Sequence, residues 1–299
     1  MNRLNSVLLL VLMIQVFLAA VVYWPQQEEL VANPAEPLLA IDRAAVAGIQ
    51  LADDQGNEAL LQRIAGRWQL PARQDLPADT ALVERLLRVL TEEWHGYPVA
   101  TSVAARQRFE VASYRFQRRV TLLGDDDAQL GTVYLGTAPA FRRIHARSDV
   151  DEAIYSIAFN SFEAPAHDAG WLDRRLLQVQ APRRIEGAGF ALAQTDSGEW
   201  RAANGATPEP RELEALLVSL ANLQVDGIAS EDQQRSLAAA KPAFNVRAVA
   251  AADKRNLDFY QLEGEHFVHD PRHDLFFTVS AYDFDRLHTL DPARLNGRP

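Results

Sequence analysis

Residues 66–94 read GRWQLPARQDLPADTALVERLLRVLTEEW, and residues 198–223 repeat the pattern as GEWRAANGATPEPRELEALLVSLANL. In each stretch a Gly-x-Trp step precedes a helix start marked by Pro and an acid, and then a Leu-Leu pair. Further matches follow in the same order: Val99-Ala100 with Ile228-Ala229, Ile154–Ile157 with Phe276–Val279, and Phe159–Phe162 with Ala281–Phe284. Matches that keep their order along a chain indicate an internal duplication.

Each copy combines strand patterns with one amphipathic helix. A stripe of apolar residues predicts a helix over Ala81–Trp94 with Asp79 as its cap, and the leucines from Leu213 to Leu223 predict its counterpart, with Thr207 as cap and Pro208 in the first turn. The expected strands are Ala47–Leu51, Leu60–Ile64, Val120–Leu123, Leu130–Leu135, Phe141–Ala146 and Ala153–Ala158, then Val246–Ala250, Leu257–Leu262, Phe267-Val268 and Leu275–Val279. Closely spaced strands pair antiparallel. The predicted fold class is therefore α+β, with two tandem units, each a mainly antiparallel β-meander packed on one main helix.

An uncharged apolar run precedes the duplication. Val7–Trp24 reads VLLLVLMIQVFLAAVVYW, with the neutral Gln15 inside it. A helix of this length rises about 27 Å, close to the ~30 Å apolar core of a bilayer. Arg3 precedes the run and Glu28 and Glu29 follow it, which predicts a cytoplasmic N-terminus and an extracytoplasmic remainder. A cleaved signal peptide and a buried core helix are the alternatives, although signal peptides have shorter apolar runs and small residues at the cleavage site.

These features predict a single-pass membrane protein, because no later apolar run approaches the length of a membrane span. The expected segments are a cytoplasmic N-terminus at 1–5, a transmembrane anchor at 6–24, a tether at 25–37, a first α+β unit at 38–177, a second unit at 178–292 and a tail at 293–299.

Composition narrows the possible functions. The chain has 299 residues, with 30 Lys and Arg against 40 Asp and Glu, a net charge of −10 and no cysteine. An acidic chain lacks the basic surface that nucleic-acid binding requires, so no nucleic-acid partner is expected. Without cysteine the chain has no disulfide, no thiolate nucleophile and no zinc ribbon.

The densest polar cluster lies between His266 and Asp274. A metal site there would use His266, His269, His273 and Asp270 as ligands. On a strand, however, His266 and His269 point to opposite faces, and the run from Asp270 to His273 is typical of a hairpin turn. We therefore interpret this cluster as a solvated turn and predict no metal and no other cofactor. Asp125-Asp126-Asp127 is likewise interpreted as an acidic turn, since it lacks the spacing of a calcium loop.

Other candidate sites also have plainer interpretations. The sequence contains no G-x-S-x-G, P-loop or H-E-x-x-H motif, so we predict that the protein is not an enzyme, while a Ser–His–Asp arrangement assembled in space stays open. Trp68 and Trp200, at matched positions, are interpreted as core residues rather than ligand platforms. Four arginine pairs would be able to bind a protein partner or an anionic glycan but are expected mainly to be solvated: Arg118-Arg119, Arg142-Arg143, Arg174-Arg175 and Arg183-Arg184.

Several of these features form a pattern over most of residues 38–290. They are the Gly-x-Trp step, Pro77-Ala78-Asp79 with Leu86-Leu87, Val99-Ala100, Phe109 before a strand, Leu135-Gly136 and Ile154-Tyr155, preceded by the apolar N-terminal segment. This pattern resembles the domain of unknown function 4340 family, although Phe109-Glu110-Val111 stands where a Phe-Gly-Leu step is expected. The resemblance implies an envelope protein linked to ABC-type export systems, including those of gliding-motility type. It implies no catalytic residue.

The N-terminal segment and the lack of catalytic motifs, together with what the resemblance implies, predict a non-catalytic, membrane-anchored, extracytoplasmic accessory or scaffold protein. We expect it in the bacterial inner membrane, as a binding subunit of an ABC-type transport complex. Its expected partners are the permease and ATPase subunits and, through the N-terminal helix, the lipid bilayer. The alternatives are an envelope hydrolase acting on glycan or peptide, which would need convergent polar groups in a cleft, and a glycan-binding module, which would need exposed aromatic residues.

Overall fold

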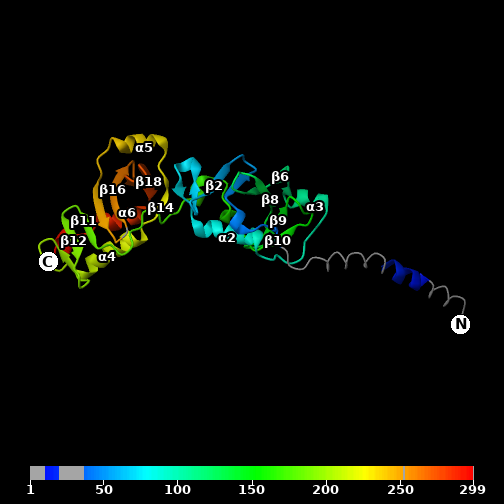
Figure 1. The fold of residues 1–299 in the computed structure, drawn as a ribbon, viewed down its shortest axis with the longest axis horizontal. Coiled ribbons are helices and arrows are strands. Elements are labelled where there is room, and N and C mark those ends of the chain that lie inside the picture. Colours follow the sequence, from blue (N-terminus) through cyan, green and yellow to red (C-terminus); the bar gives the residue numbers. More distant parts are fainter. Residues whose placement is uncertain (1–10, 20–36, 252, 299) are drawn as a thin grey trace. The chain divides into compact units, whose positions relative to one another are not determined.

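The computed structural model describes residues 11–19, 37–251 and 253–298 (Figure 1). The contacts between Cα atoms divide the chain into two compact units. One comprises the residues up to Leu60 together with Ala81–Ala166, and the other comprises Leu61–Thr80 together with the chain from His167 onward. The fold is α+β and contains two large antiparallel sheets, which confirms the predicted class at this level.

The first sheet has eight strands in the order β10-β9-β8-β7-β1-β2-β3-β4. The strands are β1 Gly48–Asp53, β2 Glu58–Ile64, β3 Arg67–Leu70, β4 Leu76–Pro77, β7 Arg118–Leu123, β8 Gln129–Leu135, β9 Ile144–Ser148 and β10 Tyr155–Ile157. The same part of the chain contains the helices α2 Thr80–Thr91 and α3 Val103–Arg108, the short hairpin β5 Val111–Ala112 and β6 Arg115–Phe116, and the 3-10 turns η1 Arg43–Ala45, η2 Pro71–Arg73, η3 Ser161–Glu163 and η4 Asp168–Trp171.

The second sheet also has eight strands, in the order β13-β12-β11-β15-β16-β17-β18-β14. The strands are β11 Arg184–Gly187, β12 Phe190–Gln194, β13 Trp200–Ala202, β14 Val225–Ile228, β15 Phe244–Val249, β16 Lys254–Leu262, β17 Glu265–Asp270 and β18 Leu275–Val279. Its helices are α4 Pro210–Asn222, α5 Glu231–Ala238, α6 Ala281–His288 and α7 Pro292–Leu295.

The two sheets share one topology. The order β3-β2-β1-β7-β8-β9-β10 in the first corresponds strand by strand to β13-β12-β11-β15-β16-β17-β18 in the second. Backbone hydrogen bonds outside the sheets correspond as well, which supports the predicted duplication. The amide of Leu39 donates to the carbonyl of Leu90 at 3.0 Å, and in the second copy the amide of Val179 donates to the carbonyl of Leu220 at 3.0 Å. Likewise, the amide of Asp79 donates to the carbonyl of Trp171 at 2.7 Å, and the amide of Glu209 donates to the carbonyl of Arg294 at 3.0 Å.

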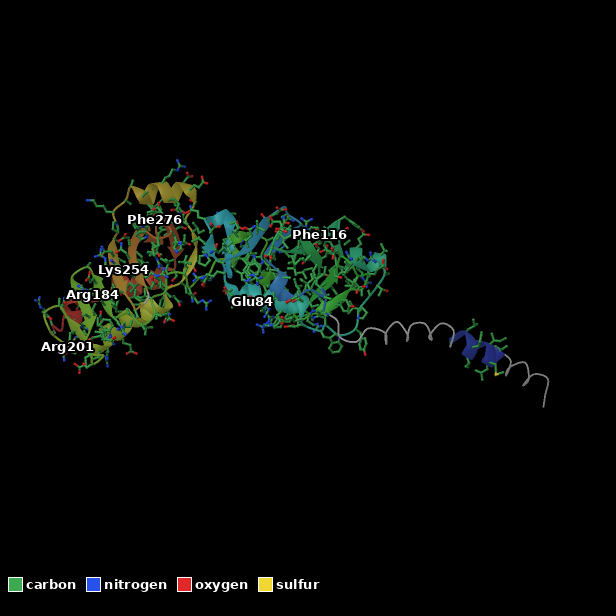
Figure 2. The ribbon with its side chains drawn as sticks, viewed as in Figure 1. Glu84, Phe116, Arg184, Arg201, Lys254 and Phe276 are labelled. Carbon is green, nitrogen blue, oxygen red and sulfur yellow. The ribbon has the colours of Figure 1, made fainter. Side chains whose placement is uncertain are left out.

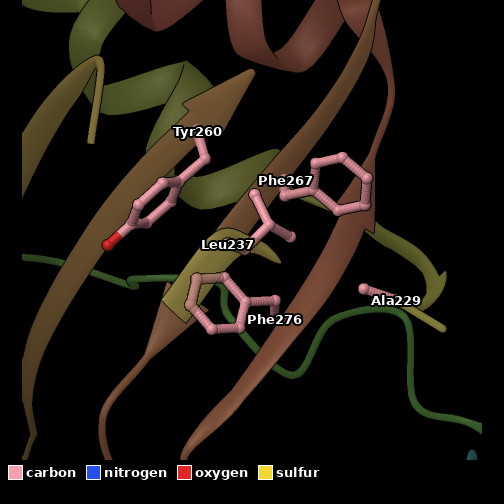
Figure 3. Packing of buried hydrophobic residues seen from close by; sticks show 5 residues of the cluster. All are labelled: Ala229, Leu237, Tyr260, Phe267 and Phe276. Atoms are coloured by element: carbon pink, nitrogen blue, oxygen red, sulfur yellow. The ribbon is translucent and has the colours of Figure 1, made fainter. Parts of the chain in front are cut away.

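The second sheet is packed on both faces. Tyr260, Phe267 and Phe276 lie on one face and form a buried cluster with Leu237 of α5 and with Ala229 (Figure 3). On the opposite face the ring of Phe259 lies 6.2 Å from that of Phe284 in α6, which also contacts α4. The prediction of one main helix per meander is therefore incomplete, because a second helix covers the other face.

The first sheet repeats this arrangement around α3. Ala105 of α3 is buried with Val111, Tyr134 and Ile154 in one cluster. Side chains alternate along each strand, so Val133, next to Tyr134, points to the opposite face of the sheet. Val133 pairs with Val120, which pairs with Leu51, and Val120 and Leu51 are completely buried on that opposite face. As in the second sheet, the short helix after the main helix packs on a sheet face.

Both main helices differ from the prediction at one end. Helix α2 ends at Thr91, because the amides of Glu92 and Glu93 both donate to the carbonyl of Arg88. Trp94 therefore lies outside the helix and is 58% exposed. Helix α4 begins at Pro210 with Glu209 as its cap, because the predicted cap Thr207 accepts a hydrogen bond from Arg201 at 2.7 Å instead.

The strand predicted from Phe141 also begins later than expected. Arg142 has a φ of 54°, a left-handed conformation that interrupts extended backbone, and β9 starts only at Ile144. Phe141 lies in the preceding loop and is 88% exposed.

The N-terminal segment is described only in part. Residues 11–19 are helical and Gln15 is exposed among them, whereas Val7 and Trp24 lie outside the described residues. Of the helices that the structure describes, none has both the length and the apolar character needed to cross a membrane.

Candidate functional site

A groove of about 510 Å³ lies beside Trp200 in the second unit. One wall is the side of α4 that carries Leu217, Val218 and Ala221, and another is the segment from Val179 that leads into β11. Trp200, the first residue of β13, is half-buried in this groove. The lining is mostly aliphatic and aromatic, which is the usual character of a binding surface.

The connection into the second sheet, which forms one wall of the groove, is shorter than the equivalent connection into the first sheet. In the first unit the chain from Leu39 to β1 includes the 3-10 turn η1 and the completely buried Val46. In the second unit the equivalent chain from Val179 reaches β11 sooner, through Ala181, whose φ is 45°, and Pro182. The segment that leads into β11 thus has no counterpart of η1.

The two matched tryptophans differ accordingly. Trp68 is 3% exposed, as expected for a core residue. Trp200 is only partly covered and lines the groove, so its interpretation as a core residue is wrong. The local Gly-x-Trp pattern is the same at both positions, so it carries no signal of this difference.

Arg183 lies at the groove and differs from the other members of the predicted arginine pairs. Among the residues that the structure describes, no carboxylate lies within ion-pair distance of its guanidinium, and its side chain is exposed. Its neighbour Arg184, which is labelled in Figure 2, pairs with Glu186 at 2.7 Å. The remaining six are engaged: Arg118 with Asp53, Arg119 over Phe116, Arg142 over Phe141, Arg143 with Ser156, Arg174 with Asp226 and Arg175 with Asp173.

Two amide side chains at the groove are already used locally. Gln194 donates to the carbonyl of Gly198 at 3.0 Å, and Asn222 donates to the carbonyl of Val218 at 2.9 Å. Their NH₂ groups therefore stabilise the backbone around the groove. Arg183 is left as the strongest hydrogen-bond donor available to a ligand.

The structure separates the predicted metal candidates. The ring of His266 lies 4.5 Å from that of Phe284 on one face of the second sheet, while the ring of His269 lies 4.5 Å from that of Phe276 on the other. His273 lies in the turn between β17 and β18. Across the described ranges, no three His, Asp or Glu side chains are grouped as metal ligands.

Asp270 belongs instead to a buried ion network. Its side chain is fully buried and accepts hydrogen bonds from Arg255 at 3.0 Å and Arg272 at 2.9 Å. Asp253 pairs with the same two arginines at 2.8 and 2.9 Å. Burial raises the pKa of Asp270, while the nearby Arg255 acts in the opposite direction. This network was not predicted, since its only local signal in the sequence is the Asp-x-Arg spacing at each end of the β16–β17 hairpin.

A second buried polar group lies in the first unit. His145 is 7% exposed, its ring stacks on Phe109 with centroids 4.0 Å apart, and its Nδ1 lies 3.0 Å from the hydroxyl of Thr137. Burial lowers the pKa of His145. Arg147, on the same strand, donates to the carbonyls of Val111 and Ser148. His145 thus contacts Thr137, which follows β8, and Arg147 binds the backbone of β5. Neither side chain lies at the groove.

The comparisons with known proteins give one match. The profile of a family described as "Domain of unknown function (DUF4340)" matches residues 68–243, which is more than half of the chain. No curated protein and no solved structure matches the chain. The match begins at Trp68 and extends through Trp200 and α4, so it includes the groove. The chain belongs to the DUF4340 family, as the resemblance of its sequence pattern indicated.

Proposed function

We propose that this protein is a non-catalytic, membrane-anchored extracytoplasmic accessory protein, and that it binds a protein partner within an ABC-type transport complex. The observation that carries the proposal is the groove beside Trp200. Tryptophan and arginine are enriched among the residues that contribute most of the binding energy at protein interfaces, and Trp200 and Arg183 both line this groove.

The membrane anchor is supported by the exposed N-terminal helix. Over residues 11–19 the large apolar side chains are 47% to 68% exposed, and these are Val11, Leu12, Met13, Ile14, Val16, Phe17 and Leu18. Together with the uncharged run Val7–Trp24 and the charges on either side of it, this helix is suited to a lipid environment. The N-terminus would then lie in the cytoplasm and both sheet units outside the bacterial inner membrane.

A link to transport rests on the family resemblance and on the effect of anchoring. Attachment to the bilayer keeps the binding surface near other membrane proteins at a high effective concentration, so even weak contacts suffice for assembly. The permease and ATPase subunits of an exporter are the partners that this arrangement favours.

The test is recovery of the complex from membranes. Full-length protein with a C-terminal tag is cross-linked in intact cells, solubilised in detergent and purified, and co-purifying subunits are identified. We expect permease and ATPase subunits with the native chain, and their loss when Val218 in the groove is changed to Glu. The matched control is Tyr282→Glu, which changes a residue 66% exposed on α6 and should keep the partners. Purification of the native protein alone would contradict the proposal.

A glycan-binding module is the second candidate, and the partial exposure of Trp200 favours it. Aromatic side chains form platforms for sugar rings, and Trp200 presents part of its surface in a groove. Binding of oligosaccharide to the native protein but not to Trp200→Ala would support this candidate over protein binding.

A further inference from the structure

Two arginines near the groove, Arg184 and Arg247, have a carboxylate partner, whereas Arg183 has none among the described residues. Glu186 accepts a hydrogen bond from Arg184 at 2.7 Å and forms an ion pair with Arg247 at 3.7 Å, so this carboxylate is already shared between two arginines. Arg183, next in the chain, is exposed at the groove without a carboxylate partner in the described part of the protein. Because the whole chain carries a net charge of −10, an uncompensated cation at an apolar surface stands out. A planar guanidinium in this state is suited to a carboxylate, which it binds through two parallel hydrogen bonds.

The apolar part of the groove is arranged along one side of a helix. Leu217, Val218 and Ala221 lie one and four positions apart on α4, and Val218 is 37% exposed. Trp200 lines the same groove. This surface is suited to one or two aliphatic side chains, with the indole providing the largest area of contact.

The polar groups favour a peptide over a glycan. Sugar recognition requires several free donors and acceptors around an aromatic platform, whereas the NH₂ groups of Gln194 and Asn222 already donate to backbone carbonyls. Arg183 is charged and so prefers an anionic group to a neutral hydroxyl.

We infer that the groove beside Trp200 binds a peptide segment of the membrane partner in which a Glu or Asp carboxylate adjoins a bulky aliphatic residue. The carboxylate pairs with Arg183, and the aliphatic side chain packs against Trp200 and Leu217. This inference rests on the proposed function, because it assumes that the partner is a protein.

The experiment observes Trp200 directly. The full-length protein is labelled with 5-fluorotryptophan, reconstituted in nanodiscs and studied by ¹⁹F NMR. The chain has five tryptophans, and the signal that disappears in Trp200→Phe identifies the groove. The probes are the blocked pentapeptide acetyl-Ala-Glu-Leu-Leu-Ala-amide and its analogue with Gln in place of Glu.

We expect the Glu peptide to shift the Trp200 signal and to bind about threefold to fivefold more tightly than the Gln peptide, as is typical of an exposed ion pair. Arg183→Gln should remove this preference, and it should also disappear at high salt. The matched control Arg184→Gln alters the neighbouring arginine, which already has a partner, and should keep the preference. Equal unfolding temperatures of the two variants would establish that both fold normally.

Three results would overturn the inference: no shift of the Trp200 signal at millimolar peptide, equal affinity for the two peptides, or a shift produced by chitooligosaccharide but not by peptide. The first two leave the proposed function standing if the cross-linked complex still contains transporter subunits. Loss of that complex, with peptide binding that depends on Arg183, would instead contradict the transport assignment while supporting the peptide site.

Discussion

Trp68 and Trp200 occupy equivalent positions in two copies of one topology, yet Trp68 is 3% exposed and Trp200 lines an open groove. Each lies two residues after a glycine of positive φ. Trp68 is the second residue of β3, and Trp200 is the first residue of β13. The duplication therefore preserved the residue while the surroundings changed. A core position in the first sheet corresponds to a groove-lining position in the second.

Substitution of the two tryptophans should have unequal effects on stability. Trp68→Ala is expected to lower the free energy of unfolding by about 3–5 kcal/mol, as for other large-to-small changes in a core. Trp200→Ala should lower it by only about 1–2 kcal/mol, because part of its surface is exposed in the native state. Urea denaturation followed by circular dichroism measures both changes, and equal losses would contradict the difference in burial.

Asp270→Asn should be strongly destabilising. The change leaves Arg255 and Arg272 around a buried neutral amide, and loss of one partner from a buried ion pair is expected to lower the free energy of unfolding by about 3–5 kcal/mol. The control Asp253→Asn removes a carboxylate that is 38% exposed and pairs with the same arginines, and about 1 kcal/mol or less is expected there. If the two variants unfold at the same urea concentration, the network does not depend on burial of Asp270.

His145 should make the stability of the first unit depend on pH. Burial lowers the pKa of His145 in the folded state, so the unfolded chain takes up its proton first as the pH falls. The stabilising contribution of the neutral ring is complete above the unfolded pKa of about 6.5 and is lost as the pH falls below that value. His145→Gln, which cannot titrate, should therefore show a smaller loss of stability between pH 7 and pH 5.

The measurement for His145 is the thermal unfolding midpoint at several pH values. His288→Gln changes an exposed histidine and serves as the control, with an expected pH dependence like that of the native chain. An unchanged pH dependence in His145→Gln would show that this ring contributes nothing to acid sensitivity.

Gly136 should not tolerate a side chain. A Cβ atom at this position would lie 1.9 Å from the carbonyl oxygen of Phe109 and 2.6 Å from that of Glu110, so the backbone itself would have to move. We expect Gly136→Ala to lower the free energy of unfolding by about 3 kcal/mol or more, at the upper end of overpacking effects. Gly124→Ala is the matched control, since its nearest neighbour would be 3.4 Å away. Similar expression and melting of the two variants would show that the segment at Phe109 adjusts freely.

Local periodicity was sufficient to predict most elements of the fold. The apolar stripe from Leu82 to Leu90 and its counterpart from Leu213 to Leu220 correspond to α2 and α4, and alternation along Leu130–Leu135 and Leu257–Leu262 corresponds to central strands. These patterns are reliable because one buried face imposes its own period on a helix or a strand. Element ends were less predictable: Trp94 and Phe141 are apolar, but hydrogen bonds at Arg88 and a left-handed Arg142 exclude them from α2 and β9.

The sequence by itself determined the α+β class and the internal duplication, since both are repeated in local patterns that each segment carries independently. Only the tertiary structure decided which tryptophan is covered, which arginine lacks a partner and which aspartate is buried. These properties depend on segments far apart in the chain, such as α4, which lines the groove together with Trp200, and the paired strands β16 and β17. A residue's exposure and its charge partners are set by the segments that fold against it, and two identical Gly-x-Trp steps can therefore place one tryptophan in a core and the other in an open groove.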